Sequence, residues 1–223
     1  MEKIFNYKSE HGSDYKVTIG KVAEQTNGEC LIQSGDTILL VTAVASEEPR
    51  EGIDFFPLLC DFQEKLYAVG KIPGGFIKRE AKPTDKATLI ARQMDRPLRP
   101  LFPENFFNDV QIVATTLSMD EDNEVDCMAT IGAAIALEIS DIPFNGPVAS
   151  VSVGYIDGEF ILNPNEKQRE ITELELTVSG TKDAINMVES GAKELSEEVM
   201  INAIIFAHEE IKKICEFIEN IGK

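Results

Sequence analysis

Residues 71–99 read KIPGGFIKREAKPTDKATLIARQMDRPLR and join a glycine- and proline-rich segment to the beginning of a helix. Gly70 just before the stretch, and Pro73, Gly74 and Gly75 near its start, disfavour regular structure, so residues 70–83 are predicted to form an exposed loop. Thr84 is a good N-cap, and apolar residues at helical spacing follow it until Pro97, where we expect the helix to end. The stretch therefore separates a strand-rich first part from a mixed second part.

The rest of the chain predicts an α+β fold in which a mixed β-sheet packs with helices. Before the stretch, residues 15–44 indicate a meander of three or four strands, and residues 55–59 and 62–69 indicate two more. After it we expect a strand over 109–119, a helix over 125–138, a hairpin over 148–162, strands over 174–179 and 187–190, and a long helix that Ser196 caps and that ends near 220.

The charge of residues 71–99 is unusual for this protein. The chain carries a formal net charge of −18, yet this stretch holds eight of the 21 Lys and Arg residues and three of the 39 acidic ones. A local basic segment in an acidic protein indicates an anionic ligand, although the arginines could instead pair with the surplus carboxylates or cover apolar surface. The eight bases are Lys71, Lys78, Arg79, Lys82, Lys86, Arg92, Arg96 and Arg99.

A single-stranded nucleic acid is the anion that best fits this arrangement. Aromatic side chains stack on unpaired bases, and cationic side chains contact phosphates. The loop presents both kinds of side chain, and three helix arginines at positions i, i+4 and i+7 share one face if the last turn continues past Pro97. The candidate RNA-binding residues are Phe76, Lys78, Arg79, Arg92, Arg96 and Arg99.

Composition excludes several other classes of protein. No apolar run approaches the ~20 residues of a membrane span, and the N-terminus does not resemble a secretory signal. Only two histidines are present, which disfavours a zinc site. We therefore expect a cytoplasmic protein without a membrane partner, whose four widely spaced cysteines are free thiols: Cys30, Cys60, Cys127 and Cys215.

Two groups of carboxylates could hold a metal, but each has a simpler interpretation. The acidic run at residues 120–126 is more typical of a solvated loop. Glu173 and Glu175 alternate with leucines and so share one face of a strand, where a pair of carboxylates can bind Mg²⁺. The solvent-facing side of an edge strand is the favoured alternative.

Three segments closely resemble the first catalytic-type domain of bacterial polynucleotide phosphorylase. They are GKIPGGFIKREAKPTDKATLIARQMDRPLRPLFP (residues 70–103), IPFNGPVASVSVGYIDGEFILNP (142–164) and LTVSGTKDAINMVESGAKELSEEVM (176–200). The resemblance implies a ribonuclease PH-type fold, related to the second domain of ribosomal protein S5. It also implies that residues 1–223 are the first of two such domains, ending where a helical linker begins, with the second domain and the RNA-binding modules absent.

The same resemblance carries expectations about activity and partners. Members of the family form a ring-shaped homotrimer that degrades single-stranded RNA from its 3′ end with inorganic phosphate and releases nucleoside diphosphates. They require Mg²⁺, which we expect in the second core domain together with the phosphate. Expected partners are RNA-degradation proteins, such as a degradosome-type helicase or endonuclease.

In the family, a loop with aromatic and basic residues projects into the central channel of the ring and grips RNA. The resemblance places this loop at Phe76, Ile77, Lys78 and Arg79 of this chain. Ile77 stands where a second aromatic residue is usual, and Lys78 stands where the family has an arginine. Lysine keeps the charge but lacks the planar fork of arginine. We therefore expect a grip on single-stranded RNA with weaker stacking.

The family's catalytic constellation is not reproduced. By internal homology Arg169 replaces one catalytic aspartate, Glu175 stands at the other, Thr177 replaces the lysine, and Asp126 and Cys127 stand at the phosphate-binding serines. We therefore expect neither catalytic nor metal-binding residues in this chain. Two alternatives stay open: a self-sufficient single-domain exonuclease of the ribonuclease PH type, and a purely structural assembly domain.

Overall fold

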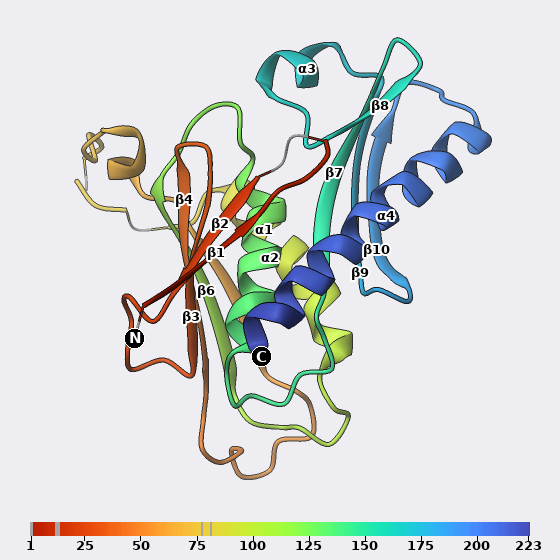
Figure 1. The fold of residues 1–223 in the computed structure, drawn as a ribbon. Coiled ribbons are helices and arrows are strands. Elements are labelled where there is room, and N and C mark those ends of the chain that lie inside the picture. The colour runs from red at the N-terminus through yellow and green to blue at the C-terminus, as the bar shows by residue number, and fades with distance from the viewer. Residues whose placement is uncertain (1, 12–13, 77, 81) are drawn as a thin grey trace.

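The computed structural model describes residues 2–223 except 12–13, 77 and 81, and among these residues two β-sheets form the framework (Figure 1). The larger sheet has the strand order β1-β2-β3-β4-β6-β5, antiparallel throughout except for the parallel pair β5 and β6. The predicted meander is confirmed as β2, β3 and β4. The strands are β1 (Lys3–Tyr7), β2 (Tyr15–Ile19), β3 (Gly28–Ser34), β4 (Thr37–Ala45), β5 (Leu58–Gln63) and β6 (Val110–Ser118).

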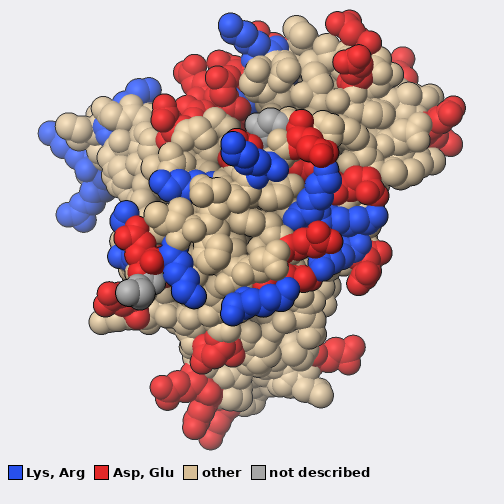
Figure 2. Space-filling view, in the orientation of Figure 1, with Lys and Arg blue, Asp and Glu red and all other residues tan. Residues whose placement is uncertain are grey.

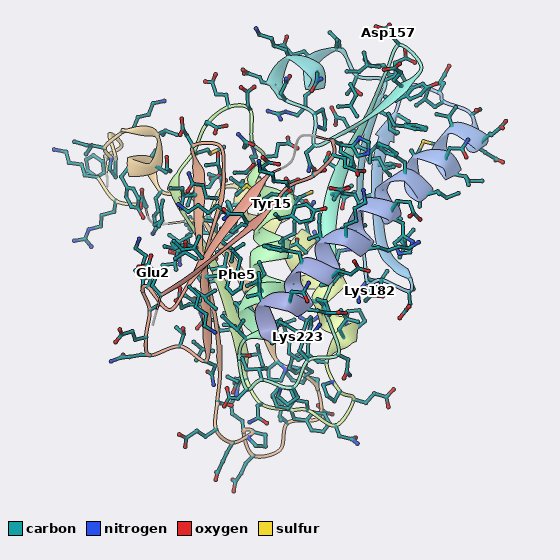
Figure 3. The ribbon with its side chains drawn as sticks, viewed as in Figure 1. Glu2, Phe5, Tyr15, Asp157, Lys182 and Lys223 are labelled. Carbon is teal, nitrogen blue, oxygen red and sulfur yellow. The ribbon has the colours of Figure 1, made fainter. Side chains whose placement is uncertain are left out.

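The smaller sheet is antiparallel in the order β10-β9-β7-β8. Its predicted hairpin is confirmed, because Asp157 and Gly158 both have positive φ, 51° and 86°, as a type I′ turn requires. Figure 3 shows Asp157 at the tip of this hairpin. The strands are β7 (Ala149–Ile156), β8 (Glu159–Leu162), β9 (Leu174–Gly180) and β10 (Ile185–Ala192).

Helix α2 (Val125–Glu138) packs against strands of both sheets and matches the predicted helix over 125–138. It is rich in small residues and almost entirely buried, so it approaches the larger sheet closely. A Cβ atom added at Gly132 would lie 2.6 Å from Cγ2 of Val41, and the Cys30 thiol donates to the Gly132 carbonyl at 3.3 Å. Small side chains are therefore required where this helix crosses β3 and β4.

Helix α4 (Glu197–Gly222) covers the smaller sheet and contacts α2 (Figure 1). The backbone N–H of Val199 donates to Ser196, which confirms the predicted cap. Lys182 lies beside α4 in Figure 3 and pairs with Glu219 at 2.7 Å. In the part of the chain that the structure describes, no helix is long and apolar enough to cross a membrane.

The prediction of two strands over 55–59 and 62–69 is wrong. The structure has one strand, β5, followed by the 3₁₀ helix η1 (Leu66–Val69), which ends at Gly70 with a φ of 68°. The apolar residues Leu66, Tyr67 and Val69 of the predicted strand are all exposed. They lie beyond the last residue that pairs with β6, so the ladder does not include them.

Pro97 does not end its helix, contrary to prediction. Helix α1 spans Asp85–Leu98 and continues into the 3₁₀ helix η2 (Arg99–Leu101). A proline in the last turn removes one hydrogen bond, to the carbonyl four residues earlier, and its φ suits the helix. The Asn186 side chain also donates to the Pro97 carbonyl at 2.9 Å. The last turn is therefore helical despite the proline.

One strand and one α-helix were not predicted. Strand β1 pairs with β2 at the edge of the larger sheet, and most of its residues are exposed or half-buried. Helix α3 (Glu166–Ile171) begins with a capping box, in which Gln168 N–H donates to the Asn165 side chain and Asn165 N–H donates to the Gln168 side chain.

Candidate nucleic-acid interface

The segment between η1 and α1 is an irregular, exposed loop, as predicted. The described residues from 71 to 83 form no helix or strand, and most of them are exposed. The Lys78 N–H donates to the Gly75 carbonyl at 3.0 Å and closes a turn that carries Phe76, whose side chain is fully exposed. Ile77, the expected second stacking position, lies outside the described residues.

This loop projects from the body of the protein and carries positive charge. In Figure 1 it lies at the left edge, away from α4, and Figure 2 shows Lys and Arg side chains gathered at the same edge. We call Phe76, Lys78 and Arg79 the tip; all three are exposed. Lys71 and Lys82 are exposed on either side of them. An aromatic ring and several cations are thus free to meet a ligand.

Helix α1 places Arg92 and Arg96 at exposed positions. Its first turn is fixed by Thr84, whose hydroxyl accepts from the Ala87 N–H at 3.0 Å. Arg96 pairs with Glu189 of β10 at 3.0 Å, and both side chains are more than half exposed (54% and 60%). Exposed pairs of this kind contribute only ~0.2–1 kcal/mol, so Arg96 can exchange Glu189 for a phosphate.

Arg99 differs from Arg92 and Arg96 because its guanidinium makes several hydrogen bonds to other groups of the protein. Its Nε and Nη2 atoms bind the Asp95 carboxylate at 2.7 and 2.6 Å. The same group donates to the carbonyls of Phe56 (3.2 Å) and Leu58 (3.1 Å). The hydrogen bond that Arg99 donates to Asp95 is the main reason why the pKa of Arg99 is raised above its ordinary value. Arg99 thus ties α1 to the beginning of β5.

Arg169, which stands at one of the family's catalytic positions, lies beside the N-terminus of α2. Arg169 of α3 lies 3.3 Å from the Glu124 carboxylate and donates to the carbonyl of Glu121 at 2.6 Å. Burial raises the pKa of Glu124, the nearby Asp126 adds to this effect, and Arg169 opposes it. Residues of this region line a small pocket: Lys86, Ile90, Met119, Asp120, Glu121, Asn123, Glu124, Val125, Asp126 and Arg169.

The side chains of this pocket do not suit the binding of phosphate or of a metal ion, which its position would imply. Four carboxylates line it, which opposes phosphate binding at the start of α2. Burial and the adjacent Asp126 raise the pKa of the Cys127 thiol well above its ordinary value, so Cys127 is not a thiolate nucleophile. Among the described residues no group of three or more His, Cys, Asp or Glu side chains could hold a metal ion. The residues here therefore do not fit the Mg²⁺ that the family implies.

The other carboxylates of the sequence analysis have structural or solvent-facing positions. Asp120 accepts from the N–H groups of Asp36, Asp122 and Asn123 at 2.8–3.0 Å. Burial opposes its ionisation, but the hydrogen bonds prevail and hold the pKa of Asp120 below its ordinary value. The acidic run therefore braces the turn between β3 and β4. Glu173 and Glu175 are both exposed.

The cysteines are free thiols, as predicted. Cys30, Cys127 and Cys215 are buried and Cys60 is partly buried. Burial raises the pKa of the Cys215 thiol to about 12. These positions fit cysteines that act as small apolar core residues.

Comparisons with known proteins agree with this description. A model of the 3′ exoribonuclease family, domain 1, matches residues 13–143, and a model of domain 2 of the same family matches residues 146–210. The boundary between the two matches falls between the larger and the smaller sheet. Rice (Oryza sativa) Rrp46 has a similar structure, with a TM-score of 0.74 over 94% of both chains at 14% identity, which supports the fold.

Similar proteins include longer enzymes of one name. The polyribonucleotide nucleotidyltransferase of Finegoldia magna is 69% identical over 212 residues, which cover 95% of this chain and 30% of that protein. The polyribonucleotide nucleotidyltransferase of Clostridioides difficile is 59% identical over 210 residues, 94% of this chain and 30% of that protein. The chain thus spans about 30% of the length of the curated relatives it matches, consistent with their first ribonuclease PH-type domain. With both family models matched and the α+β arrangement confirmed, the chain belongs to the 3′ exoribonuclease family and has the ribonuclease PH fold.

Proposed function

We propose that this chain is the RNA-holding part of a phosphorolytic 3′-to-5′ exoribonuclease that degrades mRNA in the cytoplasm. The observation that carries the proposal is the exposed tip, a projecting aromatic ring beside two cations in a protein of net charge −18. The names of the relatives support a polyribonucleotide substrate. RNA is the anion that uses both the ring and the charges.

Single-stranded RNA suits the tip better than a duplex does. Stacking of a base on an aromatic side chain contributes ~1–3 kcal/mol and does not depend on sequence. Lys78 and Arg79 would contact the phosphates on either side of a base stacked on Phe76. One tip makes few contacts, so the affinity of a single chain should be low. In the expected homotrimer three tips would surround one strand, and their effects would multiply.

We further propose that this chain does not cleave RNA by itself. Arg169 and Thr177 stand where the resemblance expects an aspartate and a lysine, and the pocket that Arg169 lines is rich in carboxylates. Phosphorolysis, with its inorganic phosphate and Mg²⁺, would then belong to a second domain of the same enzyme. The contribution of this chain is to hold the RNA strand and to build the trimeric ring, with RNA-degradation proteins as further partners.

The test compares the affinity of the chain for a labelled 20-nucleotide oligoadenylate with that of a Lys78→Ala/Arg79→Ala double variant. We expect the double variant to bind at least about ten-fold more weakly, because it loses two phosphate contacts. A Lys3→Ala/Lys167→Ala variant removes the same charge at exposed positions outside the loop and should bind nearly as the wild type. Equal affinity of the wild type and the tip variant would refute RNA binding by the tip.

Phosphorolysis is tested separately with poly(A) and inorganic phosphate in the presence of Mg²⁺. We expect no release of ADP from the 223-residue chain. Phosphate-dependent ADP release would show that the chain is a self-sufficient exonuclease.

A further inference from the structure

The loop that carries the tip is closed at its base by the carboxylate of Glu80. Helix η1 begins after Lys65, whose own side chain does not cap it. Its first N–H, that of Leu66, donates to Oε1 of Glu80 at 2.6 Å. The first N–H groups of a helix lack partners within the helix, so a carboxylate from elsewhere satisfies one of them here. Glu80 directly follows the tip in the sequence. Its carboxylate thus links the part of the loop after the tip (the far side) to η1, which precedes the loop (the near side).

The second oxygen of the same carboxylate contacts a cation. Oε2 of Glu80 lies 3.6 Å from Nζ of Lys65, and the two side chains are only 29% and 26% exposed. This pair is better shielded from water than the pair of Arg96 and Glu189. Shielded charges are screened less by salt, so this contact should persist at physiological ionic strength.

The near side of the loop is itself fixed to the larger sheet. The Lys65 N–H donates to the Thr116 hydroxyl of β6 at 3.0 Å, and the Met119 N–H donates to the Ala68 carbonyl of η1 at 3.2 Å. Helix η1 is therefore a rigid anchor. Through Glu80 this rigidity reaches the residue that follows Arg79.

The sign of the charge at residue 80 points to the same role. An acidic side chain next to Arg79 repels phosphate, so Glu80 weakens the attraction of the loop for RNA. A carboxylate that only added charge here would oppose the function. A carboxylate that fixes the tip reduces the entropy that the loop would otherwise lose when it binds a ligand.

From these contacts we infer that Glu80 is a positioning residue for RNA binding. Its carboxylate binds the Leu66 N–H and the Lys65 ammonium and thereby holds the tip in place. The inference rests on the proposed function, because it assumes that the tip contacts RNA.

The test measures oligoadenylate affinity for Glu80→Ala and Glu80→Gln. We expect Glu80→Ala to bind about three- to ten-fold more weakly, because the tip must then be ordered during binding. Glu80→Gln keeps an oxygen for the Leu66 N–H and should lie between Glu80→Ala and the wild type. Glu104→Ala removes the same charge at an exposed position outside the loop and should not weaken binding.

The direction of the effect separates the two roles of the carboxylate. If Glu80 acts only through its charge, Glu80→Ala binds RNA more tightly than the wild type, and this outcome overturns the inference. Hydrogen exchange provides a second readout: the Leu66 amide should exchange faster in Glu80→Ala at an unchanged thermal midpoint. Unchanged exchange at Leu66 would also overturn it.

The tip variant distinguishes failure of the inference from failure of the proposed function. If Lys78→Ala/Arg79→Ala binds as the wild type does, both the proposed function and the role of Glu80 are wrong. If the tip variant binds weakly and Glu80→Ala does not, only the role of Glu80 is wrong. If both hold, adding Glu80→Ala to the tip variant should cause little further loss, because Glu80 acts through the tip.

Discussion

Arg99 of η2 and Arg96 of α1 should behave as a structural and a ligand-binding residue, respectively, when each is replaced by alanine. Arg99 makes two contacts with Asp95 and two with the backbone carbonyls of Phe56 and Leu58, and its side chain is 43% exposed. A hydrogen bond that involves a charged group contributes ~1.5–3 kcal/mol when buried, and partial exposure reduces this. We therefore expect Arg99→Ala to lower the free energy of unfolding by about 2 kcal/mol.

Arg96→Ala is the matched control, because it removes the same type of side chain three residues earlier, in the last turn of α1. Its exposed pair with Glu189 should contribute only about 0.4 kcal/mol. Urea unfolding measures both variants. With a denaturant dependence of about 2 kcal/mol/M, the midpoint should fall by about 1 M for Arg99→Ala and by about 0.2 M for Arg96→Ala. Equal midpoints for the two variants would refute the structural assignment of Arg99.

The remaining predictions concern the tip, the pocket and the core. For RNA binding, removing Lys78 and Arg79 should make the slope of log K against log salt shallower by about 1.4, and unchanged slopes would show that these cations do not contact phosphates. Because the fold raises the pKa of Glu124, ionisation of this side chain lowers the stability of the protein as pH rises. Glu124→Gln should therefore be more stable than the wild type at pH 7, and this gain in stability should disappear below about pH 4. Urea unfolding at several pH values measures the gain, and a gain that persisted in acid would contradict the prediction. Gly132→Ala should lower stability by about 1–3 kcal/mol because its Cβ would meet Val41, and an unchanged thermal midpoint would show that the helix can move aside.

Much of the fold follows from local patterns in the sequence. The bounds of α2 agree with prediction because its run of small and apolar residues is unbroken, and Ser196 marks the beginning of α4. Helix α3 could have been predicted from Asn165 and Gln168, since this pair at a spacing of three forms its capping box. Strand β1 could not, because an edge strand with few buried residues has little alternation to detect.

The candidate site was predicted in composition but not in its contacts. The sequence indicates an exposed basic loop with one aromatic residue, and the structure has such a loop. It does not indicate that Arg99 binds carbonyls more than 40 residues away, or that Glu80 reaches Leu66 across 14 residues. Contacts between distant residues depend on the assembled sheet and leave no periodic signal. The same is true of Arg169 and Glu124, whose pairing requires α3 to lie beside the start of α2.

The most direct test of the account is the position at which RNA contacts the chain. A labelled oligouridylate can be cross-linked to the protein by ultraviolet light and the modified tryptic peptide identified by mass spectrometry. The account predicts the cross-link in the peptide of residues 72–78, at Phe76, where a stacked base would lie. Cross-links confined to peptides outside the loop would contradict the claim that the tip holds RNA.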